Sequence, residues 1–153
     1  MTYAAALSGS AGLTYNGAQG HLVTISSAGE NSFVTGLLSN SWVAIDDLVS
    51  EGTYKYSAGP ESGMTISYSA WGPGQPDNYN NEDCVTLWST LALPNNWNDL
   101  SCTALVGYVV EYECASGSVF SGSACQGIDC FTTSSIAACM IDCMFSLICC
   151  CEF

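Results

Sequence analysis

The chain of 153 residues is long enough for one domain with a short appendage, and its hydrophobic fraction of 48% excludes a disordered protein. Its charge is strongly negative, with one lysine or arginine against 14 aspartates and glutamates. Nucleic-acid binding is therefore excluded, because it rests on Lys and Arg side chains, and anionic membranes would repel the chain.

The first part of the chain favours a helix followed by a strand. The alanine-rich residues 2–15 favour a helix whose buried face is predicted to consist of Tyr3, Leu7 and Ala11. Residues 20–25 form a short predicted strand. This strand contains His21, the only histidine, to which we assign a structural role because no nucleophile or second base accompanies it.

A capping box opens a second predicted helix. Ser27 and Glu30 have the spacing of that motif, in which side chains cap backbone N–H groups at the helix start. The predicted buried stripe of this helix consists of Phe33, Val34, Leu37 and Leu38. Asn40 is expected to end the helix, and residues 42–45 form a predicted buried strand.

The rest of the body consists of short strands and long loops. Further strands are predicted at residues 54–56, 84–88 and 107–112. Residues 59–81 and 97–102 are predicted to be loops, and a loop as long as the first is typical of a functional segment. Two helices that precede a run of short strands indicate an α+β fold.

Side chains that end in oxygen gather in these two loops. The stretch from Trp71 to Cys84 places carboxylates and carboxamides around Pro76, and Asn98 and Asp99 follow downstream. Oxygen ligands from separate loops, with a single competing cationic side chain, indicate a hard cation such as Ca²⁺. The alternative is a solvated acidic surface, the usual fate of carboxylates, but the motif-like spacing favours a cation site.

Short motifs along the chain occur in the order seen in C-type lectin-like domains, and residues 2–113 resemble that family. The motifs are residues 20–25, 27–33, 42–45, 75–77, 82–85 and 97–99. The resemblance implies a double-loop α+β fold, with two helices beside small antiparallel sheets and a long calcium-binding loop. It implies a domain at residues 1–114.

The resemblance also implies a primary site for calcium and sugar and an auxiliary calcium site. The implied primary ligands are Gln75, Asp77, Glu82, Asn98 and Asp99. The implied auxiliary ligands are Asp47, Glu51, Asn78 and Asp83, with Glu82 shared between the two sites. The Gln75–Pro76 bond is expected to be cis, and Gln-Pro-Asp resembles the galactose-type arrangement. Tyr79 is placed either to stack on the sugar, which would bind through Gln75, Asp77, Glu82 and Asn98, or to pack within the loop.

Two departures from the family concern its covalent and strand framework. Cys84 and Cys102 match one of the usual disulfides, whereas Tyr15 and Val110 are expected to stand at the positions of the other pair. The family's first strand, before the initial helix, is expected to be missing. Its absence would leave an exposed strand edge that another segment could cover.

Residues 115–153 are predicted to form a separate cysteine-rich tail. The chain has ten cysteines, eight of them from Cys114 to Cys151, which indicates disulfides and an extracellular or secreted protein. Zinc binding is the competing use of such cysteines. The apolar run at 136–151 is too short for a membrane span. Residues 1–20 do not resemble a signal peptide, so a mature or partial chain is expected.

The sequence therefore predicts a calcium-dependent, carbohydrate-binding domain of galactose type and no enzyme, since no nucleophile–base pair is present. The alternative is a structural subunit of an extracellular filament, in which the tail covers the missing strand in its own domain or in the next protomer. A third interpretation is ice binding, which some cysteine-rich relatives of this fold perform.

Overall fold

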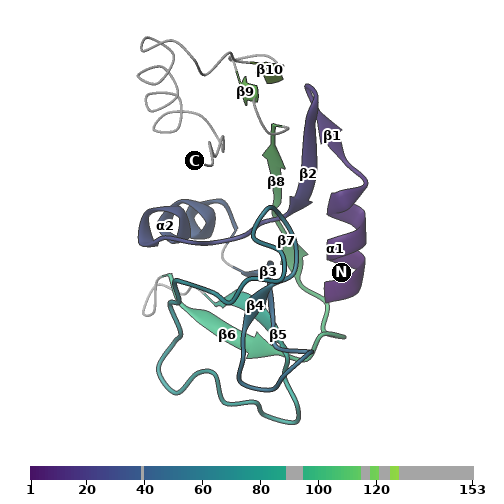
Figure 1. Ribbon diagram of the computed structural model, residues 1–153. Coiled ribbons are helices and arrows are strands. Elements are labelled where there is room, and N and C mark those ends of the chain that lie inside the picture. The colour runs from purple at the N-terminus through teal and green to yellow at the C-terminus, as the bar shows by residue number, and fades with distance from the viewer. Residues whose placement is uncertain (39, 89–94, 115–117, 121–124, 128–153) are drawn as a thin grey trace.

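The computed structural model describes residues 1–38, 40–88, 95–114, 118–120 and 125–127. In this part of the chain two helices accompany mostly antiparallel strands, which is the α+β fold that the sequence predicts (Figure 1). Neither of these helices has the length and apolar character that crossing a bilayer requires.

The described elements are two helices and ten strands. The helices are α1 (Tyr3–Ala11) and α2 (Ala28–Leu37). The strands are β1 (Thr14–Tyr15), β2 (Ala18–Leu22), β3 (Asn40–Asp46), β4 (Lys55–Tyr56), β5 (Cys84–Trp88), β6 (Trp97–Leu100), β7 (Gly107–Tyr108), β8 (Val110–Glu113), β9 (Ser118–Phe120) and β10 (Cys125–Gly127). Their pairing gives one sheet of order β1-β2-β8, a second of order β4-β3-β5-β6 with β7 beside β3, and the pair β9-β10.

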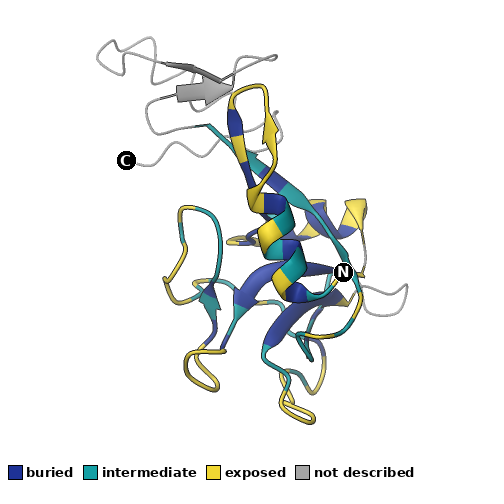
Figure 2. Ribbon diagram, turned by 90° about the vertical axis from the view of Figure 1, so that its right-hand side faces the viewer, coloured by how far each residue is buried: buried dark blue, intermediate teal, exposed yellow. Residues whose placement is uncertain are grey.

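Strand β3 runs through the centre of the domain and separates two apolar clusters. Successive residues of a strand point to opposite faces, so β3 contributes to both. Trp42 and Ala44 pack with Tyr3 of α1. Val43 and Ile45 pack in the other cluster with the buried face of α2. Figure 2 shows these central strands as buried and the loops around them as exposed.

The first helix is shorter than the predicted helix over residues 2–15. It begins after the N-cap Thr2, whose hydroxyl accepts a hydrogen bond from Ala5 N, and it ends at Ala11. Its buried residues are Tyr3, Ala6 and Ser10. The prediction that Ala11 lies on the buried face is wrong, because the register of the helix turns that side chain to solvent.

Strands β1 and β2 form a hairpin in place of the end of the predicted helix. Thr14 pairs with Gln19, and Asn16 and Gly17 between the strands have φ values of 48° and 84°. Asn-Gly is a strong hairpin signal, because both residues of this turn type adopt positive φ. The sequence therefore contains the signal for the hairpin.

The second helix starts as predicted but buries a different face. Ser27 accepts a hydrogen bond from Glu30 N at 3.3 Å, whereas the Glu30 carboxylate accepts from Ser26 N at 2.7 Å, one residue before the expected N-cap. Of the predicted stripe only Val34 is buried, and Phe33, Leu37 and Leu38 are 46%, 54% and 38% exposed. The buried face is completed by Asn31 and Thr35.

The buried face of α2 is polar because it meets the start of β6. Asn31 Oδ1 accepts a hydrogen bond from Trp97 Nε1 at 2.7 Å, and Asn31 Nδ2 donates to the Asn95 carbonyl. The helix ends at Leu37, and Asn40, which was predicted to end it, begins β3 instead.

Two strand predictions near the end of the body are also corrected. Residues 97–100 form strand β6 rather than a loop, with Trp97 and Asp99 buried and Asn98 pairing with Thr86 of β5. The predicted strand 107–112 is divided at Val109, because β7 pairs with β3 and β8 pairs with β2. Asn and Asp disfavour strands, which explains why β6 was missed.

Tyr15 and Val110 are not neighbours, so the prediction that they replace a disulfide pair is wrong. Tyr15 pairs with Ala18 and packs on Tyr112, with ring centroids 5.7 Å apart. Val110 pairs with Leu22, four residues further along β2, which corresponds to about 13 Å. The β1–β2 hairpin thus places Tyr15 beside Ala18 and away from Val110.

The tail is described only at β9 and β10, which pair with each other and not with β8. Among the described residues, no strand of the tail pairs with β8. The apolar run at 136–151 and the predicted filament contact lie outside the described residues. Cys114 takes part in a disulfide, as predicted for the cysteines of this region.

Replacing Gly20 by alanine is expected to lower the free energy of unfolding by about 1–3 kcal/mol, the usual range for overpacking. A Cβ at Gly20 would lie 2.8 Å from the Ser10 carbonyl oxygen and 3.0 Å from that of Leu13, and backbone atoms cannot move aside easily. Urea denaturation of the two proteins measures the difference. Gly29→Ala is the matched control, because its Cβ meets nothing within 4 Å, and equal losses in both variants would contradict the account.

Candidate functional site

The predicted long loop between β4 and β5 is held against β6 at its centre. Gly72 N donates to the Trp97 carbonyl at 2.9 Å, and Trp97 N donates to the Ala70 carbonyl at 2.8 Å. The Trp71 ring packs edge-on against Trp97, with centroids 5.8 Å apart. These contacts bring the Gln75–Pro76 bond, which is cis as predicted, toward the strand that carries Asn98 and Asp99.

Three carboxylates converge where the loop meets β6. Ligand oxygens of Asp77, Glu82 and Asp99 lie within 4.8 Å of one another. Asp99 is fully buried and accepts hydrogen bonds from Asp77 N at 3.2 Å and Asn78 N at 2.7 Å. Burial, together with the charges of Asp99 and Asp77, raises the pKa of Glu82. Such mutual repulsion is what a bound cation relieves.

Two carboxamides accompany these carboxylates. Gln75 Oε1 is buried without a hydrogen-bond donor, which is costly for a polar atom unless a cation or ligand contacts it. Asn98 Nδ2 donates to the Asp99 carbonyl, so the amide nitrogen is tied to the backbone and the amide oxygen is the end that a cation can use. The structure thus brings together three of the predicted primary ligands, Asp77, Glu82 and Asp99. Asn98 precedes Asp99 on β6, and Gln75 lies two residues before Asp77 on the loop with an unsatisfied oxygen.

A turn of asparagines returns the loop to the cluster. Asn78, Asn80 and Asn81 have φ values of 47°, 56° and 69°, a conformation that Asn adopts more readily than most residues. Asn78 Oδ1 accepts from Glu82 N at 2.8 Å, which directs Glu82 back toward Asp77. The contribution of Asn80 and Asn81 was not predicted from the sequence, although the run of asparagines was its signal.

The predicted auxiliary ligands gather beside the first cluster. Asp47 is 2% exposed; its Oδ2 accepts from Gly52 N at 2.7 Å, and its Oδ1 is buried without a donor. Burial raises the pKa of Asp47, and the charges of Asp83 and Asp99 raise it further. Asp47 N donates to the Asp83 carbonyl at 3.1 Å. Desolvation and the charges of Asp47 and Asp83 raise the pKa of Glu51, so these carboxylates lie close together.

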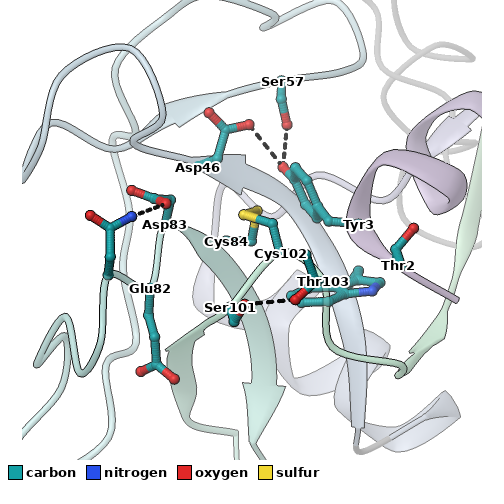
Figure 3. The surroundings of a disulfide bond; sticks show 12 residues. Thr2, Tyr3, Asp46, Ser57, Glu82, Asp83, Cys84, Ser101, Cys102 and Thr103 are labelled. Carbon is teal, nitrogen blue, oxygen red and sulfur yellow. Dashed lines mark hydrogen bonds between the residues drawn. A yellow bond between two sulfur atoms is a disulfide. The ribbon is translucent and has the colours of Figure 1, made fainter.

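Glu82 and Asp83 are consecutive residues just before β5, and their side chains lie at different clusters, Glu82 with Asp77 and Asp99 and Asp83 with Asp47. Figure 3 shows their side chains leaving the chain in different directions, beside the Cys84–Cys102 disulfide. That disulfide, predicted from the resemblance, joins the start of β5 to the turn after β6, with Cα atoms 5.2 Å apart. It therefore links the two segments that carry the carboxylates.

These residues fit a divalent cation such as Ca²⁺. Carboxylate and carboxamide oxygens are the ligands that this ion prefers, and two of them are buried with no donor. Lys55 is the only Lys or Arg of the chain, so the 14 aspartates and glutamates far outnumber the cationic side chains that could neutralise them. Tyr79 lies beside the cluster on the loop and is 68% exposed, so its ring is accessible to a ligand.

Comparisons of the sequence with known proteins identify a family and similar proteins. The sequence model of the Lectin C-type domain matches residues 14–112. A Perlucin-like protein of Mytilus galloprovincialis is 38% identical over 98 residues, covering 59% of this chain and 60% of the relative. An alpha-N-acetylgalactosamine-specific lectin of Patiria pectinifera is 32% identical over 100 residues, covering 60% of this chain and 57% of the relative. The chain thus spans about 60% of the length of these curated relatives.

Solved structures resemble the fold over a larger share. The cow C-type carbohydrate-recognition domain of CD23 is similar with a TM-score of 0.58 and 27% identity, over 76% of this chain and 82% of that one. The C-type lectin CEL-I from Cucumaria echinata is similar with a TM-score of 0.58 and 26% identity, over 72% of this chain and 81% of that one.

Proposed function

This chain belongs to the family of C-type lectin domains, and on that premise we propose that it binds a galactose-type glycan through Ca²⁺. The observation that carries the proposal is the convergence of Asp77, Glu82 and Asp99, whose ligand oxygens lie within 4.8 Å of one another. The unsatisfied Gln75 oxygen on the same loop supports it. The family and its similar lectin support the more general function of carbohydrate binding.

The chain's own residues would hold the ion and orient the sugar. Gln75, Asp77, Glu82, Asn98 and Asp99 would supply the oxygens of the primary site, and Asp47, Glu51, Asn78 and Asp83 those of an auxiliary site. A bound Ca²⁺ ion would offer coordination positions to hydroxyl oxygens of the sugar, because this ion takes about six to eight oxygen ligands. Gln75 and Asn98 would donate hydrogen bonds to the hydroxyl oxygens of the sugar. The carboxylates of Asp77 and Glu82 would accept hydrogen bonds from the same hydroxyl groups.

Galactose preference would follow from where donors and acceptors stand. Gln75 offers an amide donor on one side of Pro76, and Asp77 offers a carboxylate acceptor on the other. The arrangement with Glu before and Asn after the proline, which is the mannose type, reverses these roles. The name of the Patiria pectinifera lectin, which specifies alpha-N-acetylgalactosamine, supports the galactose type for this chain.

We further propose that the protein acts in an extracellular, oxidising environment. The Cys84–Cys102 disulfide and the disulfide of Cys114 support this, because disulfides persist in such compartments.

Replacing the two residues that flank Pro76 by those of the mannose type tests the galactose assignment directly. The double variant Gln75→Glu, Asp77→Asn is expected to reverse the ratio of galactose to mannose affinity, with each affinity changing about tenfold or more because hydrogen bonds become mispaired. Competition with free sugars on a glycan-coated surface measures the ratio. An unchanged preference in a variant that still binds sugar would contradict the galactose assignment.

Replacing Tyr79 by alanine is expected to weaken galactose binding about 2- to 10-fold while Ca²⁺ affinity stays the same, since a stacked ring contributes about 0.5–1.5 kcal/mol. Titration calorimetry with each ligand separates the two effects. Tyr15→Ala is the matched control, because Tyr15 is another exposed tyrosine, at 56%, on a hairpin away from the loop. Equal sugar affinity in both variants would assign Tyr79 to loop packing.

A further inference from the structure

A second group of charged side chains lies between β2 and β8, at the end of the domain away from β5 and β6 (Figure 1). His21 of β2 is directly opposite Glu111 of β8, and Glu113 follows on the same face of that strand. Ligand atoms of these three residues lie within 4.8 Å of one another. None of them belongs to the calcium clusters on the long loop.

The imidazole of His21 is fixed in one tautomer. Its Nδ1 lies 2.9 Å from the Leu22 carbonyl oxygen, which can only accept, so Nδ1 carries the proton and donates. In the neutral ring Nε2 then presents a lone pair. A histidine that donates one ring N–H to a backbone carbonyl and leaves the other nitrogen unprotonated has the arrangement found in metal-binding histidines.

The lone pair of Nε2 faces a carboxylate with no donor between them. Nε2 is buried and makes no hydrogen bond, His21 is 9% exposed, and Glu113 Oε2 lies 3.7 Å away, a distance at which the two side chains would form an ion pair if the ring were protonated. Two acceptors that face each other in a buried position are stabilised by a proton or a metal ion between them. The separation is close to that of two ligands on tetrahedral zinc, about 3.4 Å for metal–ligand distances of about 2.0–2.2 Å.

A third carboxylate, that of Glu61, lies beside Gly59, which lines the cleft. A Cβ at Gly59 would lie 3.0 Å from His21 Cε1 and 3.2 Å from Glu61 Oε2, so Gly59 separates the ring from this carboxylate. Glu61 Oε2 and Glu113 Oε1 are both buried without donors. The cleft has a volume of ≈ 440 Å³, which admits an ion and water, and His21, Gly59 and Glu113 line it.

We propose that this cleft binds a divalent transition-metal ion of the zinc class, with His21 Nε2 and Glu113 as ligands and Glu61 closing the site. Glu111 lies behind the ring, 3.9 Å from Nδ1, and accepts from Thr24 N at 2.9 Å, so it acts as a positioning residue. An imidazole ligand favours zinc-class ions over Ca²⁺, which prefers oxygen. The site is thus separate in chemistry from the calcium clusters.

The competing occupant of the gap is a proton. Burial alone would lower the pKa of His21, but Glu113 and Glu111 together raise it, so a protonated imidazole could pair with these carboxylates. Burial raises the pKa of Glu111 to about 7 and also raises the pKa of Glu61, so a proton or a metal ion would relieve the cost of burying these charges, and a measurement on the imidazole has to distinguish the two occupants. Cys114 also lines the cleft, but it is in a disulfide and offers no thiolate.

The single histidine of the chain makes the decisive measurement possible without a variant. Long-range ¹H–¹⁵N correlation spectra of the ¹⁵N-labelled full chain, saturated with Ca²⁺ at pH 7.5, contain one set of imidazole signals. Added ZnCl₂ is expected to shift the Nε2 signal, to leave Nδ1 protonated and to abolish the pH titration of the ring. If the imidazole chemical shifts do not change on addition of Zn²⁺ and still change with pH in its presence, the occupant is a proton and the proposal is overturned.

Calorimetry assigns the ligands independently. Glu113→Gln, which keeps the size of the side chain, is expected to weaken Zn²⁺ binding about 100-fold or more, since even the loss of an outer partner weakens metal binding about 10- to 100-fold. Asp77→Asn, which removes a carboxylate of the calcium cluster, is expected to leave Zn²⁺ binding unchanged. Wild-type Zn²⁺ affinity in the Glu113 variant, with its fold verified by circular dichroism, would contradict the site.

Discussion

Replacing Asp99 by asparagine is expected to abolish calcium-dependent sugar binding and to weaken Ca²⁺ binding about 100-fold. The substitution keeps the shape of the side chain but removes its charge and turns one acceptor into a donor. Asp99 is fully buried and accepts from the backbone N–H groups of Asp77 and Asn78, at 3.2 and 2.7 Å. Losing a charge-assisted, buried interaction of this kind corresponds to about 3 kcal/mol, or about two factors of ten.

Calorimetric titration with CaCl₂, followed by galactose, measures both losses. Glu113→Gln is the matched control, because it also removes one carboxylate, but at the other end of the domain, where it should leave Ca²⁺ affinity intact. A variant Asp99→Asn that binds Ca²⁺ as the native chain does would show that this residue is no ligand.

Removing the Cys84–Cys102 disulfide is expected to lower the free energy of unfolding by about 3 kcal/mol, and Tm by about 10 °C or more. The bond closes a sequence separation of 18 residues, and its loss frees the unfolded chain. Cys84 is also fully buried in the cluster with Tyr3 and Trp42. Ca²⁺ binding should weaken as well, because Glu82 precedes Cys84 closely and Asp99 lies shortly before Cys102.

Thermal unfolding of the double variant Cys84→Ser, Cys102→Ser, with and without Ca²⁺, measures these effects. Ser101→Ala is the control from the same turn, since its exposed hydrogen bond to Thr103 contributes little (Figure 3). Similar Tm values in the double variant and this control would mean that packing alone holds β5 to β6.

The sequence predicted the parts of the fold that local chemistry determines. Strand β3 is apolar enough to be recognised, Ser27 begins α2 as expected, and the cis Gln75–Pro76 bond and the Cys84–Cys102 disulfide follow from the resemblance. The resemblance also predicted that Asp77 and Asp99 converge. Strand β3 and the start of α2 depend on local sequence, whereas the disulfide and the meeting of Asp77 with Asp99 join distant positions and were expected only from the family resemblance.

What the sequence did not predict depends on contacts between distant segments. The second helix was expected to bury Phe33, but it buries Asn31 because Trp97 Nε1 donates to that amide from β6. Asp99 lies on a strand because the pairing of β6 with β5 outweighs the low strand preference of Asn and Asp. His21 gained its acidic neighbours only through the register of β2 with β8, which no local pattern reveals.

Retention of the full chain on immobilised galactose in the presence and absence of Ca²⁺ decides whether this domain is a calcium-dependent galactose binder. We expect retention in millimolar CaCl₂, complete release by EDTA, and no retention on immobilised mannose under the same conditions. Retention that EDTA does not release, or passage through every glycan column in CaCl₂, would contradict a calcium-dependent galactose site.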